Sequence, residues 1–158
     1  ALAAEYPDAV IVQTHRDPLK VITSVSALAA HLRRMASDDV DLHEISADYA
    51  EDIFLGLDRG IDARQRGVIP AERIVDVHFG DFVADPIATV RGIYAALGRE
   101  LDDLTEKKMR TFLAEHPGDG GGGGTRYRFA DTGLEEGPLR ERAEAYEAFS
   151  GVAREPVA

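Results

Sequence analysis

The chain has 158 residues, a formal net charge of −11 and no cysteine. Its length suits one domain that buries about 70% of its unfolded surface, and its 44% hydrophobic and 30% charged content is typical of a globular protein. The lack of cysteine excludes disulfides, thiolate zinc sites and cysteine nucleophiles, and it fits a reducing cytoplasm. The net charge argues against binding to nucleic acid, and the short apolar runs argue against a membrane span.

The first predicted strand leads directly into a helix. Residues 9–14 are an apolar, β-branched run, which is typical of a strand buried on both faces of a parallel sheet. Asp17 suits an N-cap, Pro18 suits the first helical position, and apolar residues then follow at helical spacing. Residues 1–5 resemble the end of a helix, so we expect an N-terminal piece of the domain to be absent.

A second helix and a second strand complete a crossover connection. Apolar residues recur every fourth position and predict a helix over residues 42–66, which Gly67 and Pro70 end. Residues 73–79 alternate apolar and polar side chains, and their place after two helices predicts a parallel return strand. Two strands do not form a stable sheet alone, so we expect further strands from the missing piece or from a partner.

The rest of the chain is predicted to be helical. Asp85-Pro86 repeats the helix-start signal and Gly98 ends that helix. Further helices are predicted over residues 104–115 and 136–149, and the five glycines at 120–124 exclude regular structure between them. We therefore predict a single domain over residues 1–158, of α/β class, with a parallel sheet flanked by helices in three layers and incomplete at its N-terminus.

The junction at residues 15–18 is the strongest candidate for a binding site. A helix N-terminus presents free N–H groups and a positive dipole end to anions, and Arg16 stands beside this one. Ser24 follows Asp17 by nearly two helical turns, which returns its hydroxyl to almost the same face. An arginine fork and a hydroxyl together suit a phosphate monoester. The alternative is that Arg16 pairs with Asp17 and that Ser24 bonds its own helix.

Two other kinds of site are disfavoured. His15-Arg16-Asp17 also opens a protein-kinase catalytic loop, but Ile22 stands where that loop requires asparagine. The five histidines are scattered without the close ligand pairs that zinc sites show, so we expect no metal.

Three blocks of sequence together resemble the sulfotransferase family. The run Tyr-Pro-Asp-Ala-Val-Ile-Val-Gln-Thr-His-Arg-Asp-Pro, through Ser24, resembles its 3′-phosphate-binding segment, including the eight-residue spacing from Arg16 to Ser24. Residues 77–86 resemble the family's strand followed by an Asp-Pro helix start. Residues 126–134 are similar to the Arg-Tyr-x-x-x-Asp-x-Gly-Leu signature of its bacterial branch.

The resemblance implies a P-loop-type fold and a specific donor, 3′-phosphoadenosine 5′-phosphosulfate (PAPS). Arg16 and Ser24 would bind the 3′-phosphate of PAPS or of its product PAP. The loop carrying Gly124 and Arg126 would close over the same nucleotide, although the glycine run is equally typical of a plain surface loop. Phe79 stands where the family often has a tyrosine near the adenine, with a core phenylalanine as the alternative.

The resemblance also implies which parts are lacking. The family's phosphosulfate-binding loop and catalytic base lie before the segment that residues 15–18 resemble, so we expect no catalytic residue in this chain and no activity from the chain alone. The predicted function is transfer of a sulfuryl group from PAPS to a hydroxyl or amine of an unidentified small molecule, with homo-oligomerisation possible. The alternative is a non-catalytic α/β module that binds a nucleotide or a partner protein.

Overall fold

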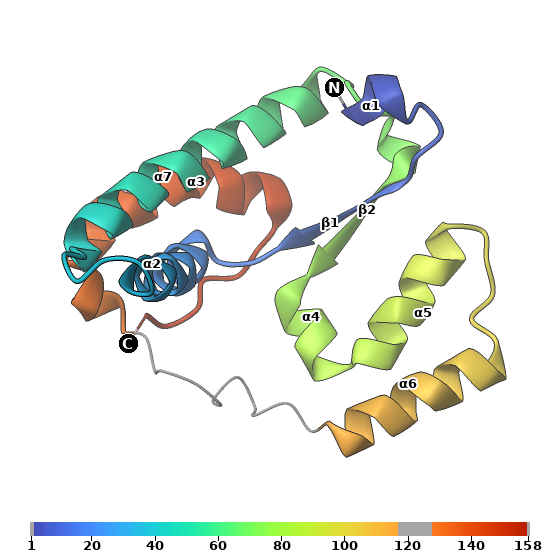
Figure 1. Cartoon of the computed structure of the whole chain (residues 1–158). Coiled ribbons are helices and arrows are strands. Elements are labelled where there is room, and N and C mark those ends of the chain that lie inside the picture. The colour runs from blue at the N-terminus through green and yellow to red at the C-terminus, as the bar shows by residue number, and fades with distance from the viewer. Residues whose placement is uncertain (1, 117–127, 158) are drawn as a thin grey trace. The chain divides into compact units, whose positions relative to one another are not determined.

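The computed structural model describes residues 2–116 and 128–157. Figure 1 shows their helices and strands. The chain forms two compact units, one of residues 1–15 and 67–126 and one of residues 16–66 and 127–158. The two units are described separately below.

The first unit contains the sheet. After α1 (Leu2–Glu5), β1 (Ile11–His15) pairs in parallel with β2 (Ile74–His78). The register sets Ile11 opposite Ile74 and His15 opposite His78. The predicted parallel pairing of a strand with its return strand is confirmed, and the carboxyl ends of both strands lie at the same edge.

Burial of β1 differs from the prediction. Val12 and Thr14 are exposed, whereas His15 at the end of the strand is buried. Alternate side chains of a strand point to opposite faces, so one face of β1 carries the exposed pair. Within the described residues β1 is therefore covered on one face only, which differs from the burial on both faces that its sequence predicted.

The end of β2 also differs from the prediction. The strand ends at His78, and Phe79 begins a short helix, α4 (Phe79–Ala84), that the alternating pattern did not predict. Asp85 then caps α5 (Pro86–Ala96) by accepting a hydrogen bond from the Ala88 backbone N–H at 2.8 Å. Asp102 caps α6 (Asp103–Glu115). The two later helices match the prediction closely.

The second unit is a helical assembly. It comprises α2 (Pro18–Arg34), α3 (Leu42–Gln65) and α7 (Glu136–Ser150), and α3 packs against both of the others. Their shared core contains six buried side chains: Leu19, Ile22, Ala50, Phe54, Phe129 and Ala143. All three helices were predicted, and burial of their apolar faces holds the start of α2 in a fixed environment.

Gly133 explains part of the block at residues 126–134. Its φ of +71° follows a short 3-10 turn, Phe129–Thr132, that places Phe129 in the core. A Cβ at this position would lie 2.8 Å from Cγ of the His43 ring. Glycine is required both by the left-handed backbone and by the neighbouring ring.

Among the described helices, none has an apolar stretch long enough to cross a membrane.

Candidate functional site

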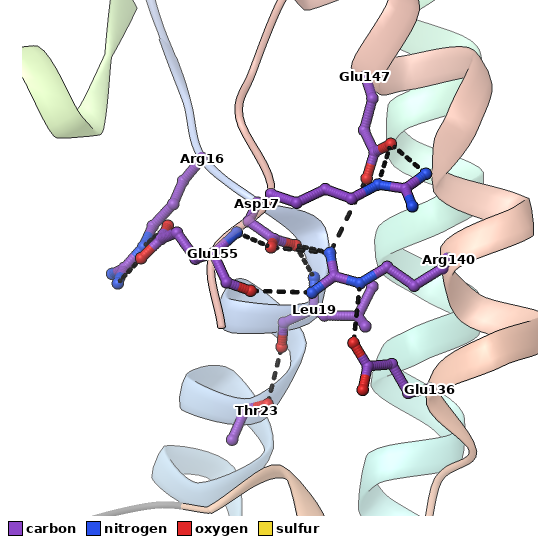
Figure 2. Close-up of polar contacts among 9 residues, drawn as sticks. Arg16, Asp17, Leu19, Thr23, Glu136, Arg140, Glu147 and Glu155 are labelled. Atoms are coloured by element: carbon purple, nitrogen blue, oxygen red, sulfur yellow. Dashed lines mark hydrogen bonds and ion pairs between the residues drawn. The ribbon is translucent and has the colours of Figure 1, made fainter. Parts of the chain in front are cut away.

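Arg16 lies between β1 and α2 and is held by a carboxylate from the C-terminal segment. Its Nε donates to Glu155 Oε1 at 2.9 Å and its Nη2 donates to Oε2 at 3.0 Å. Figure 2 shows the two side chains facing each other edge to edge. Each is 34% exposed. This bidentate geometry is the one in which a guanidinium also binds a phosphate.

Asp17 is the buried centre of the same junction. Its side chain caps α2 by accepting from the Leu19 backbone N–H at 2.9 Å, as predicted. It also accepts from Arg140 Nη1 at 2.9 and 2.8 Å and from the Glu155 backbone N–H at 2.6 Å. The alternative that paired Arg16 with Asp17 is therefore replaced by two separate ion pairs, Arg16 with Glu155 and Asp17 with Arg140.

Arg140 on α7 ties the junction to the C-terminal segment. Besides Asp17, it donates from Nε to Glu136 at 3.1 Å and from Nη2 to the Glu155 carbonyl at 2.9 Å. Burial opposes the charged form of this side chain, but the hydrogen bonds to Asp17 and Glu136 outweigh it and raise the pKa of Arg140. The guanidinium stays charged, and it links α7 to the start of α2 and to the C-terminal segment (Figure 2).

Ser24 lies on the exposed surface of α2. Within the described residues its hydroxyl makes no hydrogen bond, so the alternative of a bond to its own helix is wrong. That bond is made by the neighbouring residue, because Thr23 donates to the Leu19 carbonyl at 2.7 Å. Ser24 stands about 10 Å along the axis from Asp17 at a rise of 1.5 Å per residue, so a ligand shared with Arg16 depends on the length of the arginine side chain.

The other three predicted site residues do not belong to the described part of the unit that contains Arg16. Phe79 belongs to the first unit, where it begins α4 and is 38% exposed, which argues against the core alternative. Gly124 and Arg126 lie outside the described residues. Their nucleotide roles stay predictions.

The parallel register brings together two histidines that the sequence pattern left apart. The rings of His15 and His78 have centroids 5.5 Å apart, and His15 Nε2 lies 2.9 Å from Asp76 Oδ1. The signal was present, since a histidine stands at the end of each strand. Among the described residues, no group of three or more histidine, aspartate or glutamate side chains is placed to hold a metal ion.

Sequence reasoning missed Glu155 and Arg140. Both stand far along the chain from Arg16 and Asp17, and neither belongs to the three blocks of resemblance. An arginine on a helix and a glutamate in a tail are ordinary surface residues until the fold places them. No local signal could have identified them.

Comparison with known proteins decides the family. A family model described as the sulfotransferase family matches residues 1–103, which include the strand pair and the Arg16 junction. The chain belongs to the sulfotransferase family. The resemblance noted in the sequence is thereby confirmed over about two thirds of the chain.

Two solved sulfotransferases share the fold. Sulfotransferase STF9 from Mycobacterium avium superposes with a TM-score of 0.84 at 27% identity, over 96% of this chain and 38% of that protein. Sulfotransferase STF1 from Mycobacterium tuberculosis H37Rv superposes with a TM-score of 0.70 at 30% identity, over 91% of this chain and 35% of that protein. The chain thus spans little more than a third of these relatives. No curated protein sequence matches it significantly.

Proposed function

We propose that this chain binds the 3′-phosphate of PAPS or PAP within a cytoplasmic sulfotransferase that modifies a hydroxyl or amine of a small molecule. The observation that carries the proposal is the position of Arg16. Its guanidinium stands at the start of α2, where Glu155 already engages it in the bidentate geometry that also suits phosphate.

The surroundings of Arg16 fit a phosphate monoester. The first turn of α2 adds the positive end of a helix dipole, and Ser24 adds an exposed hydroxyl on the same helix. Asp17 is fully engaged by Arg140 and by backbone N–H groups, so its negative charge is compensated inside the unit. The junction therefore offers cationic and neutral donors on a rigid frame.

The proposed contribution of this chain is binding and orientation of the donor. PAPS supplies the sulfuryl group that is transferred, and Arg16 and Ser24 hold its far end so that the reacting end is placed correctly. We assign no catalytic residue to this chain and propose that the chain alone is inactive. Gly124, Arg126 and Phe79 are proposed as further nucleotide contacts on the family resemblance.

Calorimetric titration of PAP tests the proposal, after circular dichroism has shown that the chain is folded. Arg16→Ala removes hydrogen bonds to a charged group, which are worth about 1.5–3 kcal/mol, so we expect PAP affinity to fall at least about tenfold. Arg66→Ala is the matched control, because Arg66 makes an exposed pair with Asp62 four residues earlier on α3.

Equal loss of affinity in both variants would indicate general electrostatic attraction and contradict a specific site. Unchanged affinity in Arg16→Ala would remove Arg16 from the site.

A further inference from the structure

The C-terminal segment places the carboxylate of Glu155 against Arg16, the residue that is proposed to bind phosphate. Both carboxylate oxygens of Glu155 accept hydrogen bonds from Arg16, one from Nε at 2.9 Å and one from Nη2 at 3.0 Å. A phosphate that binds the same edge in bidentate form needs the positions of those two oxygens. The Glu155 carboxylate and the nucleotide phosphate therefore compete for one edge of one side chain.

We infer that Glu155 is an intramolecular competitor that sets the affinity of the Arg16 site for the nucleotide 3′-phosphate. This inference rests on the proposed function. Glu155 holds the guanidinium in its bidentate orientation when the site holds no nucleotide, and its side chain turns away when the phosphate binds. Affinity is then reduced by the fraction of molecules in which Arg16 is engaged by Glu155.

The structure shows how the side chain can leave while the segment stays. The backbone of Glu155 is fixed at both polar groups, because its N–H donates to Asp17 at 2.6 Å and its carbonyl accepts from Arg140 at 2.9 Å. Its side chain, in contrast, is 34% exposed and can rotate toward water. Release of Arg16 therefore requires rotation of one side chain and leaves the buried Asp17–Arg140 pair in place.

Charge favours competition over joint binding. A phosphate monoester carries more than one negative charge at neutral pH, and a carboxylate on the same guanidinium would repel it at short range. Solvent still reaches about a third of each side chain, and ion pairs that water can screen are weak, so the competition is modest in size. We expect removal of the Glu155 charge to tighten PAP binding about two- to sixfold.

The test is calorimetric titration of PAP into the 158-residue chain and into Glu155→Gln. This substitution keeps the backbone groups that Asp17 and Arg140 use, and matching circular dichroism spectra confirm the fold. Glu144→Gln is the control, because it removes the same charge from an exposed position on α7, where Glu144 Oε1 lies 4.0 Å from Arg154 Nη2. We expect tighter binding in Glu155→Gln and a change of less than about twofold in Glu144→Gln.

A second pair of measurements ties the gain to Arg16. In the double variant Arg16→Ala with Glu155→Gln the gain should vanish, and adenosine 5′-monophosphate, which lacks the 3′-phosphate, should show no gain in Glu155→Gln. Equal or weaker PAP binding in Glu155→Gln would overturn the competitor role, while loss of binding in Arg16→Ala would still support the phosphate site. Absence of PAP binding in the folded chain and in Glu155→Gln would overturn both.

Discussion

Two Asp-Pro dipeptides begin helices in this chain, and they have very different surroundings. Asp85 is exposed, and its carboxylate caps α5 through the Ala88 N–H. Asp17 is 1% exposed, and besides capping α2 it binds Arg140 and the Glu155 N–H. The same local signal thus serves one helix start that is only a cap and another that also organises a candidate binding site.

The difference teaches which part of a helix start is local. Capping depends on residues within one turn, so Asp-Pro predicted both helices equally well. The ion pair with Arg140 depends on packing of α7, 123 residues further along the chain. Experiments can therefore separate the contribution of helix capping, which Asp17 and Asp85 share, from that of the ion pair with Arg140, which only Asp17 makes.

The largest effect is expected from a matched pair of substitutions, Asp17→Ala and Asp85→Ala. Asp85→Ala removes one cap and should lower the free energy of unfolding by about 1 kcal/mol. Asp17→Ala also leaves Arg140 buried without its closest carboxylate, which costs about 3–5 kcal/mol. Urea unfolding followed by circular dichroism measures both, and equal losses would show that the Asp17–Arg140 pair adds nothing beyond capping.

A second matched pair sets Gly133 against Gly151. Both have a left-handed φ, +71° and +70°, but an added Cβ meets the His43 ring only at Gly133. Alanine at Gly151 should cost about 1–2 kcal/mol through backbone strain, and alanine at Gly133 should cost at least about 1 kcal/mol more because of overpacking. Thermal unfolding compares the two. A His43→Ala background should remove most of the difference, and persistence of the full difference would contradict the packing explanation.

The smallest effect concerns an exposed ion pair in the block at residues 126–134. A hydrogen bond from Arg128 lowers the pKa of Asp131 below its ordinary value. Because the folded pKa is the lower one, the stabilisation is present above the unfolded value of about 3.9 and is lost as the pH falls through the folded pKa. Arg128→Gln should raise the pKa of Asp131 in an NMR titration and barely change stability at neutral pH. An unchanged pKa would contradict the contact.

Much of the fold could be predicted because its signals are local. Helical periodicity located α3 and α7, and the Asp-Pro signals located the starts of α2 and α5. The pattern failed at Phe79, because alternation of apolar and polar residues continued one residue past the strand and could not show the turn into α4.

The candidate site was predicted only in part. Arg16 and Ser24 belong to one continuous segment, so spacing and family resemblance could nominate both as candidates. Glu155 and Arg140 reach the site through the tertiary fold, at sequence separations of 139 from Arg16 and 123 from Asp17. Long-range ion pairs leave no pattern in a single sequence, and the carboxylate that faces Arg16 could be found only in the structure.

The central claim is that Arg16 binds the 3′-phosphate. The most direct test compares the affinities of two ligands, with and without that phosphate, for the chain and for Arg16→Ala. PAP and adenosine 5′-monophosphate differ by that phosphate, so each is titrated calorimetrically into the folded chain and into Arg16→Ala. The account predicts that the chain binds PAP at least about tenfold more tightly than the monophosphate and that Arg16→Ala removes most of this preference. A preference that survives in Arg16→Ala would contradict the claim.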